Sequence, residues 1–408
     1  MTWFRFLVAG YTVSAFGSNL NMVAVGLYAY LVTGSPLHTG LFMALRVAAG
    51  FLAGLAAGPL VTRLPRKRIM VTADLVQSTA MLSLALLPAA AAVGPLYGVA
   101  VATGACHTLT TVSLRSGVPA MVGQSARVRA NGMLVSARAV AMVAGFAAAG
   151  ILVGSIGYTA VFSITAATFA LSAANLSWLP VLASVPGPQR QPGERRSSLA
   201  LAAAAFQAAP LLAAMVAVRA GDALGSASHI VGLPVYATII EPAAPAVFLS
   251  QFWTAWAVGM LLAQQLVTRL AGRRPGAVNE WSFTAATIAM SALFIGAFAG
   301  LTGIGLMFVA LLAGLADGYT ETAYLSRLQT VSDDRRGPMF GMVAMVEQSS
   351  LGIGMVVAAG LLQAFPPPLV AVAMHGFAIL LGLSLLTLLV VRRLGQTPAA
   401  EPSQWPGT

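Results

Sequence analysis

The sequence predicts an all-α polytopic membrane protein with twelve transmembrane helices, arranged as two six-helix repeats of the same orientation in the bilayer. Three observations carry this prediction: a shortage of charge, a series of long apolar runs, and an internal repeat. Charged residues make up 8% of the 408 positions and hydrophobic residues 58%, whereas about a quarter of a soluble domain is charged. So few charges cannot cover the surface of a soluble protein.

Apolar runs bounded by glycine, proline and arginine clusters place the helices, because roughly 18 or more consecutive apolar residues are typical of a membrane span. In the first half the helices are predicted near 6–31, 38–61, 69–88, 95–115, 131–153 and 157–180. In the second half they are predicted near 204–238, 245–266, 281–299, 303–326, 339–363 and 368–391. The resulting units are an N-terminal bundle (1–180), a Pro- and Arg-rich linker (181–199), a C-terminal bundle (200–391) and a tail (392–408).

Positive charge follows the connections between these helices. The net charge is +11, and nineteen of the 22 Lys and Arg residues lie near the termini, in the central linker or in alternate connections. Because cytoplasmic loops of membrane proteins are enriched in Lys and Arg, both termini and the linker are predicted to be cytoplasmic. The same placement argues against nucleic acid as the partner of this charge and favours a lipid bilayer.

An internal repeat relates the two halves. Leu60–Leu64 and Leu266–Leu270 are the same five residues, Leu-Val-Thr-Arg-Leu, and further cations follow each copy. The pair Gly17-Ser18 likewise recurs 208 positions later as Gly225-Ser226. Six helices in each half give the two copies the same orientation, related by an axis along the membrane normal.

Seven ionisable residues fall inside or next to predicted spans, where each costs roughly 2.5 kcal/mol or more and needs a partner or a wet cavity. They are Arg46, Arg138, Arg219, Asp222, Asp317, Glu321 and Glu347. Arg219 and Asp222 share one helix face, either as a structural pair or along a substrate path. Asp317 and Glu321 are four residues apart, as a proton site or as a structural contact. Arg46 is one option as the partner of Glu347, and Arg138 is near enough to the cytoplasmic end to reach the interface.

The sequence lacks the residue patterns of several kinds of catalytic and binding site. The chain has no Gly-x-x-x-x-Gly-Lys-Ser/Thr nucleotide loop, and its single lysine is Lys67. A Gly-x-Ser-x-Gly nucleophile motif is absent, and no group of His, Cys and acidic residues has metal-ligand spacing. One cysteine, Cys106, gives no disulfide framework. We therefore expect no enzymatic activity, no cofactor and no metal.

The basic connection after the second helix resembles a known signature. It reads Gly-Pro-Leu-Val-Thr-Arg-Leu-Pro-Arg-Lys from Gly58, and is similar to the Gly-x-Leu-x-Asp-Arg-x-Gly-Arg-Lys loop of the major facilitator superfamily. Thr62 replaces the acid of that signature and Pro65 its second glycine. The resemblance implies a conformational loop formed by Gly58, Thr62, Arg63, Arg66 and Lys67, with Asp74 as the partner of its cations.

Four further phrases are similar to bacterial drug and siderophore exporters of this superfamily, such as macrolide-efflux and enterobactin-exporter proteins. They are Leu31–Pro36, Ala73–Leu75, Arg129–Gly132 and Arg336–Gly341. The fifth helix departs from the pattern: it reads Gly-Phe-Ala-Ala-Ala-Gly where proton-coupled exporters usually carry Gly-Pro-x-x-Gly-Gly. The resemblance implies a monomeric, multi-pass protein of a bacterial inner membrane.

In this superfamily the first, fourth, seventh and tenth helices line a central cavity. The resemblance therefore implies a set of substrate-cavity candidates: Asn19, Asn21, His107, Arg219 and Tyr324. It implies proton coupling through a second set, Asp222, Asp317, Glu321 and Glu347.

We expect a secondary active transporter that exports a small amphipathic compound, such as a drug, a natural product or a siderophore, by proton antiport and alternating access. The altered fifth helix leaves uptake and lipid translocation open as alternatives. A non-transporting membrane receptor is the alternative from another class, against which the buried charges argue because each is costly in hydrocarbon.

Overall fold

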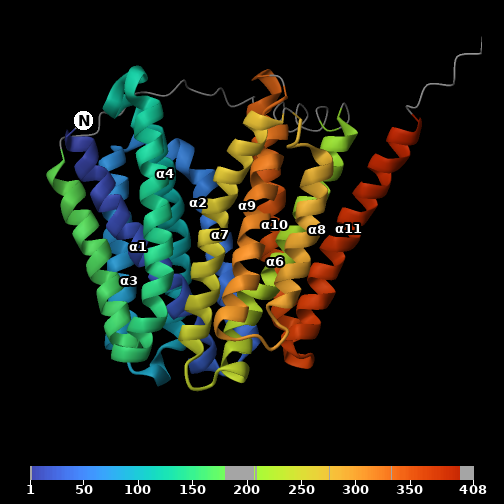
Figure 1. Ribbon diagram of the computed structural model, residues 1–408. Coiled ribbons are helices and arrows are strands. Elements are labelled where there is room, and N and C mark those ends of the chain that lie inside the picture. The colour runs from blue at the N-terminus through green and yellow to red at the C-terminus, as the bar shows by residue number, and fades with distance from the viewer. Residues whose placement is uncertain (1, 180–205, 207–208, 275, 332, 396–408) are drawn as a thin grey trace, which may run out of the picture.

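The computed structural model describes residues 2–179, 206, 209–274, 276–331 and 333–395 as a bundle of helices (Figure 1). The α-helices are α1 (Thr2–Thr33), α2 (Pro36–Arg63), α3 (Arg66–Leu86), α4 (Val93–Trp178), α6 (Pro210–Ile240), α7 (Pro245–Arg273), α8 (Glu280–Gly296), α9 (Gly303–Leu328), α10 (Asp333–Ala364) and α11 (Pro367–Gly395). A short 3₁₀ helix, η1 (Ala89–Ala91), precedes α4. Within these ranges the chain forms no β-strand.

Helix α4 runs for 86 residues and folds back on itself. A straight helix of that length would extend about 130 Å, yet Leu114, Ala130 and Leu176 all belong to one buried cluster. One reversal therefore lies between Leu114 and Ala130. The second lies at Gly157, whose φ of 80° is readily adopted only by glycine. Helix α4 thus comprises three crossings, which agree with the fourth, fifth and sixth predicted helices.

Twelve crossings result from this arrangement. Nine helical spans in the described chain are long and apolar enough to cross a membrane, and one of them, Arg129–Trp178, is 50 residues long and crosses twice. The two remaining crossings are the first part of α4 and the 17-residue helix α8. The predicted all-α, twelve-helix architecture is confirmed.

Successive crossings alternate in direction, so the Arg-rich connections gather at one end of the bundle, called here the basic end. It includes Arg63–Arg68 between α2 and α3, Arg273 at the end of α7, and Arg327 at the end of α9. In Figure 1 the basic end is uppermost, where the N-terminus lies. The other end is called the distal end.

Buried side chains are divided unevenly between these two ends. The largest cluster joins the N-terminal half (α1–α4) to the C-terminal half (α6–α11), and includes Phe146 and Phe252. Two smaller clusters lie toward the basic end, one formed only by the N-terminal half around Leu7 and one only by the C-terminal half around Tyr324. The halves therefore pack together at the centre and the distal end and separate toward the basic end, where the bundle widens (Figure 1).

The repeat seen in the sequence reappears as matched glycine contacts inside each half. A Cβ at Gly104 would collide with the carbonyl oxygen of Arg46, and a Cβ at Gly314 would collide with that of Trp256. Both residues of the first contact stand 210 positions before those of the second. The same backbone approach thus joins the second and fourth crossings of each half.

A second pair of contacts follows the same relationship. A Cβ at Gly145 would lie 2.8 Å from the carbonyl oxygen of Phe16, and a Cβ at Gly354 would lie 2.9 Å from that of Leu224. The glycines are 209 positions apart and their partners 208. Close backbone approach in both halves explains why these positions need glycine.

The predicted linker, 181–199, lies outside the described residues, as does most of the predicted tail, 392–408. Helix α11 extends to Gly395, a few residues beyond the predicted end of the last crossing.

Candidate functional site

At the distal end the two halves touch through glycine. A Cβ at Gly40 of α2 would lie 2.8 Å from the carbonyl oxygen of Met355 on α10. A Cβ at Gly150 of α4 would lie 3.0 Å from the carbonyl oxygen of Ala246 on α7. These two contacts bring the backbones of the halves together on both sides of the bundle.

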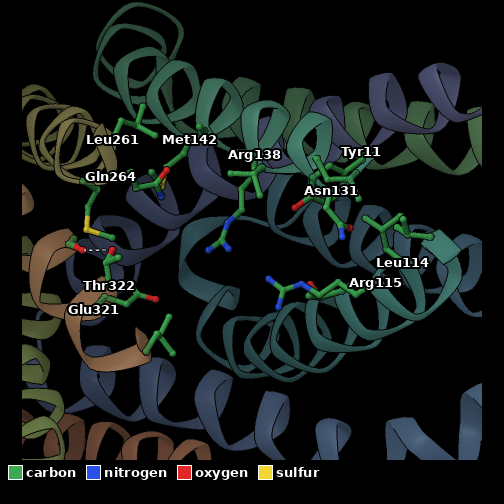
Figure 2. A pocket seen from close by; sticks show the side chains of 18 of the residues that line it. Tyr11, Leu114, Arg115, Asn131, Arg138, Met142, Leu261, Gln264, Glu321 and Thr322 are labelled. Atoms are coloured by element: carbon green, nitrogen blue, oxygen red, sulfur yellow. Dashed lines mark hydrogen bonds between the residues drawn. The ribbon is translucent and has the colours of Figure 1, made fainter. Parts of the chain in front are cut away.

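Toward the basic end the halves instead enclose a cavity of about 600 Å³ (Figure 2). Its walls come from α1 and α4 on one side and α7 and α9 on the other. Apolar side chains form much of the lining: Leu114, Leu134, Met142, Met260, Leu261 and Leu325. Neutral polar groups from both halves, among them Asn131 and Gln264, complete it. A pocket of this size and mixed character suits a drug-sized ligand.

Charged side chains face one another across this cavity. Arg115 and Arg138, both on α4, point into it from the N-terminal half, and Glu321 on α9 points in from the opposite wall (Figure 2). These three are the charged members of the lining, so the cavity carries one excess positive charge. The sequence places Arg115 in a charged connection and Arg138 at the membrane interface; in the structure both turn toward the cavity.

A cluster of acids surrounds Arg219 behind the cavity wall. The Arg219 Nη1 group donates a hydrogen bond to Asp222 Oδ2 at 3.0 Å, and Arg219 Nε lies 3.9 Å from Glu347 Oε1 on α10. The guanidinium carbon is 5.6 Å from the centre of the Tyr324 ring on α9. Asp222 is buried and Arg219 is largely enclosed, with side chains 6% and 14% exposed. One arginine therefore ties together α6, α9 and α10.

Asp317 and Glu321 extend this cluster along α9. The indole nitrogen of Trp256 on α7 donates to Asp317 Oδ2 at 3.2 Å, and Glu321 lies one turn further toward the basic end. All four predicted acids, Asp222, Asp317, Glu321 and Glu347, are within electrostatic range of Arg219. The structure thus brings the predicted proton-coupling set together around one cation, with Glu321 as its member in the cavity.

The comparison with known families agrees with this architecture. The Major Facilitator Superfamily profile matches residues 7–346, which is most of the chain. The chain belongs to the major facilitator superfamily. A comparison with curated proteins found no match.

Solved structures of other superfamily transporters share the fold. The nucleoside transporter NupG is 13% identical, with a TM-score of 0.76 over 95% of this chain and 99% of that one. A bacterial homologue of the human lysosomal transporter Spinster, in an inward-facing and occupied conformation, is 16% identical, with a TM-score of 0.70 over 98% of each chain. A bacterial homologue of the iron transporter ferroportin in an inward-facing state is 14% identical, with a TM-score of 0.70 over 94% of this chain and 98% of that one. At these identities the likeness concerns the fold alone.

The two asparagines of α1 do not line the cavity. Asn19 donates from Nδ2 to the carbonyl oxygen of Ala15 at 2.7 Å and packs against Gly145 of α4. Asn21 is buried, 4% exposed. Tyr324 likewise lies behind the cavity wall, in the buried cluster of the C-terminal half.

His107 and Arg46 line a second cavity, also of about 600 Å³, between α2, α4 and α10. Gly50 and Phe51 of α2 and Gln348 of α10 contribute to its lining. This cavity is related to the first by the repeat, because α2 and α10 correspond to α7 and the middle crossing of α4. Glu347, for which the sequence offered Arg46 as a partner, lies instead beside Arg219.

The conformational loop between α2 and α3 is bound to its own half. Lys67 Nζ donates to the carbonyl oxygens of Ser177 at 2.7 Å and Leu179 at 2.6 Å, where it caps the last turn of α4. The Arg66 side chain is buried and packs against Gly117. The loop's cations therefore fasten the crossings of the N-terminal half to one another.

Asp74, expected to pair with that loop, lies deep in α3. It is 1% exposed, and the hydroxyl of Ser14 on α1 donates to its Oδ1 atom at 3.4 Å. This contact joins α1 to α3 within the N-terminal half.

A buried histidine pair escapes recognition from the sequence. His229 Nδ1 on α6 lies 3.1 Å from His375 Nε2 on α11, and the Phe294 ring stacks on His229 with centroids 3.9 Å apart. The two histidines are 146 positions apart, and neither stands in a polar motif, so no local pattern connects them. In the described chain no group of three or more His, Cys, Asp or Glu side chains is arranged to hold a metal.

Proposed function

We propose that this superfamily transporter exports a small amphipathic compound from the cytoplasm in exchange for protons, by alternating access. The observation that carries the proposal is the Arg219 cluster, in which one largely enclosed cation contacts acids on α6 and α10 and an aromatic ring on α9. Its nearest partners are Asp222 at 3.0 Å and Glu347 at 3.9 Å. Ionisable groups inside a membrane are costly, and in transporters they mark ion and proton paths.

The direction of the proposal rests on the charge of the connections. Lys and Arg enriched at the basic end make that end cytoplasmic, together with both termini. The cavity then opens toward the cytoplasm of a bacterial inner membrane, and the glycine contacts at the distal end close the outer side. A compound entering from the cytoplasm meets Glu321 first, while Asp317 lies one turn deeper.

Proton exchange follows from the ratio of acids to cations in the cluster. Arg219 balances one carboxylate, whereas Asp222, Asp317, Glu321 and Glu347 all lie in its electrostatic range. The excess carboxyl groups become costly when a conformational change removes water from them, unless they bind protons. Proton binding and the movement of the halves are thereby coupled.

Flux measurements in inverted membrane vesicles test the proposal. With the cytoplasmic face outward, an imposed pH gradient is expected to drive accumulation of a fluorescent amphipathic compound drawn from a substrate panel. Combined replacement of Asp222, Asp317 and Glu321 by their amides is expected to abolish accumulation. Glu280→Gln is the matched control, because Glu280 pairs with Arg327 at the basic end, at 2.9 Å. Gradient-driven flux that survives the triple replacement would overturn the coupling assignment.

The second cavity favours lipid translocation as the second candidate function. It lies between α2 and α10, and its lining includes Phe51, Leu55 and Met345. The neighbouring Leu52 side chain is 63% exposed, so this side of the bundle presents apolar surface where acyl chains lie. Transbilayer movement of a fluorescent phospholipid in proteoliposomes, lost on Gly54→Leu within the cavity, would favour this candidate over export of a free amphipathic compound.

A further inference from the structure

The two halves differ sharply in charge. Residues 1–180 contain ten Lys and Arg residues and a single acid, Asp74. That acid is buried in α3 beside Ser14 and is not part of the cavity lining. The N-terminal wall of the cavity is therefore cationic, and its own half supplies no carboxylate to neutralise it.

Arg115 and Arg138 carry this charge into the cavity. Their side chains converge from two crossings of α4 that run side by side (Figure 2). Glu321, on the far wall, offers one negative charge against two positive charges. An anion placed between the two guanidinium groups would receive charge-assisted hydrogen bonds from both, which are the strong kind.

We propose that the cavity recognises an amphipathic monoanion, with its anionic group held between Arg115 and Arg138. The inference rests on the proposed function and names its substrate class. One negative charge brings the cavity to neutrality. The apolar body of the ligand lies along Met142 of α4 and Met260 and Leu261 of α7.

The anion can come from a free amphipathic compound or from the headgroup of an anionic lipid. Both present the same group to the arginines, a carboxylate, sulfonate or phosphodiester of charge minus one. Glu321 repels such a group and keeps it on the N-terminal wall, since like charges repel.

Binding to the full-length protein in nanodiscs tests the inference, with empty nanodiscs as the blank. The probes are dansylglycine, a monoanion, and dansylglycinamide, its neutral counterpart of nearly the same shape. Equilibrium dialysis in phosphatidylcholine nanodiscs is expected to give a dissociation constant for the anion at least about tenfold below that of the amide, as expected for charge-assisted hydrogen bonds. Addition of phosphatidylglycerol to the nanodisc identifies the source of the anion. Weaker binding of dansylglycine indicates a lipid headgroup, and unchanged binding indicates a free compound.

Variants then locate the charge. Arg138→Gln is expected to remove the tenfold preference while binding of the amide is retained, and Glu321→Gln is expected to strengthen anion binding severalfold. Arg129→Gln is the matched control, because Arg129 lies on the same helix, is exposed, and is not part of the cavity lining. Equal binding of the two probes, no binding of either, or a preference unchanged by Arg138→Gln would overturn the inference.

The proposed function fails by a different result. If anion binding depends on Arg138 but no compound is moved by a pH gradient, the anion site stands and proton-driven export falls. If a pH gradient drives flux but the preference for dansylglycine is absent or unchanged by Arg138→Gln, export stands and the anion site falls.

Discussion

The two halves of the molecule share a scaffold and differ in the charges that it carries. Glycine contacts place Gly104 against Arg46 and Gly314 against Trp256 with an offset of 210. By the same offset, His107 of the N-terminal half corresponds to Asp317 of the C-terminal half.

The sign of the charge reverses between the middle crossing of α4 and its counterpart α10. The offset of 209 between Gly145 and Gly354 pairs Arg138 with Glu347. At this pair of positions the N-terminal half carries a cation and the C-terminal half carries an acid.

Packing and charge have thus diverged independently. The backbone contacts are kept because any side chain larger than glycine would collide with a carbonyl oxygen. Side chains that face water-accessible space have no such packing constraint. Their charge can therefore differ between the halves according to what each half binds. This difference fits the two proposals above, in which the N-terminal half binds the anion and the acids around Arg219 in the C-terminal half bind protons.

The largest expected effect comes from removing the one cation of the acidic cluster. Arg219→Gln leaves Asp222 and Glu347 without their partner, and loss of one member of a buried pair costs about 3 kcal/mol or more. Equilibrium unfolding in mixed detergent micelles measures the loss in the free energy of unfolding. Arg327→Gln is the control, because its pair with Glu280 is at the basic end with the arginine 43% exposed, where such pairs contribute about 1 kcal/mol or less. Equal losses in the two variants would contradict a special role for Arg219.

A smaller effect is expected from overpacking the distal contacts, which should destabilise the state that is closed at the distal end by about 2 kcal/mol. Gly150→Leu places a side chain against Ala246 and Ser250 of the other half, and should shift the protein away from the state that is closed at the distal end. Gly154→Leu is the control, because a Cβ at that glycine has open space around it.

Labelling at the cavity reads out this shift. In a Cys106→Ala background, Gln264→Cys reports access from the basic end to a polar maleimide. Gly150→Leu should slow labelling severalfold, and Gly40→Leu, which overpacks the other distal contact, should do the same. A fast reaction in both variants would show that the distal contacts do not control access to the cavity.

The fold was predictable because its signals are local. Apolar runs, Arg-rich connections and the repeated Leu-Val-Thr-Arg-Leu phrase each act over short stretches, and together they gave the twelve crossings and their repeat. The four acids around Arg219 were also found, since ionisable residues stand out in apolar helices.

The lining of the cavity was not predictable in the same way. Arg115 reads as part of a basic connection, and only the fold of α4 turns it toward Arg138. Asn19 and His107 lie on the predicted helices but face a helix contact and the second cavity. Which face a helix presents depends on its packing against segments far away in the chain, and that information is absent from a local pattern.

A third effect concerns the link between the cavity wall and the acidic cluster. Trp256→Phe removes the hydrogen bond to Asp317 Oδ2 at 3.2 Å and keeps an aromatic ring in place. Hydrogen bonds to charged groups contribute about 1.5 kcal/mol or more, so both stability and gradient-driven flux should fall. Trp178→Phe is the control, because Trp178 is 85% exposed at the end of α4. A variant with normal flux would show that Asp317 needs no donor from α7.

The smallest effect is expected at the basic loop. Thr62→Asp restores the acid of the superfamily signature, but the loop's neighbouring cations already engage their own half: Lys67 caps α4 through Ser177 and Leu179. An added carboxylate is therefore expected to pair with these cations inside the N-terminal half and to leave the contacts between the halves unchanged. Labelling of Gln264→Cys should change by less than about twofold, consistent with the small effect of most surface substitutions. A severalfold change would show instead that the loop contacts the C-terminal half in another conformation. The cations of the N-terminal half would then also affect the opening of the cavity.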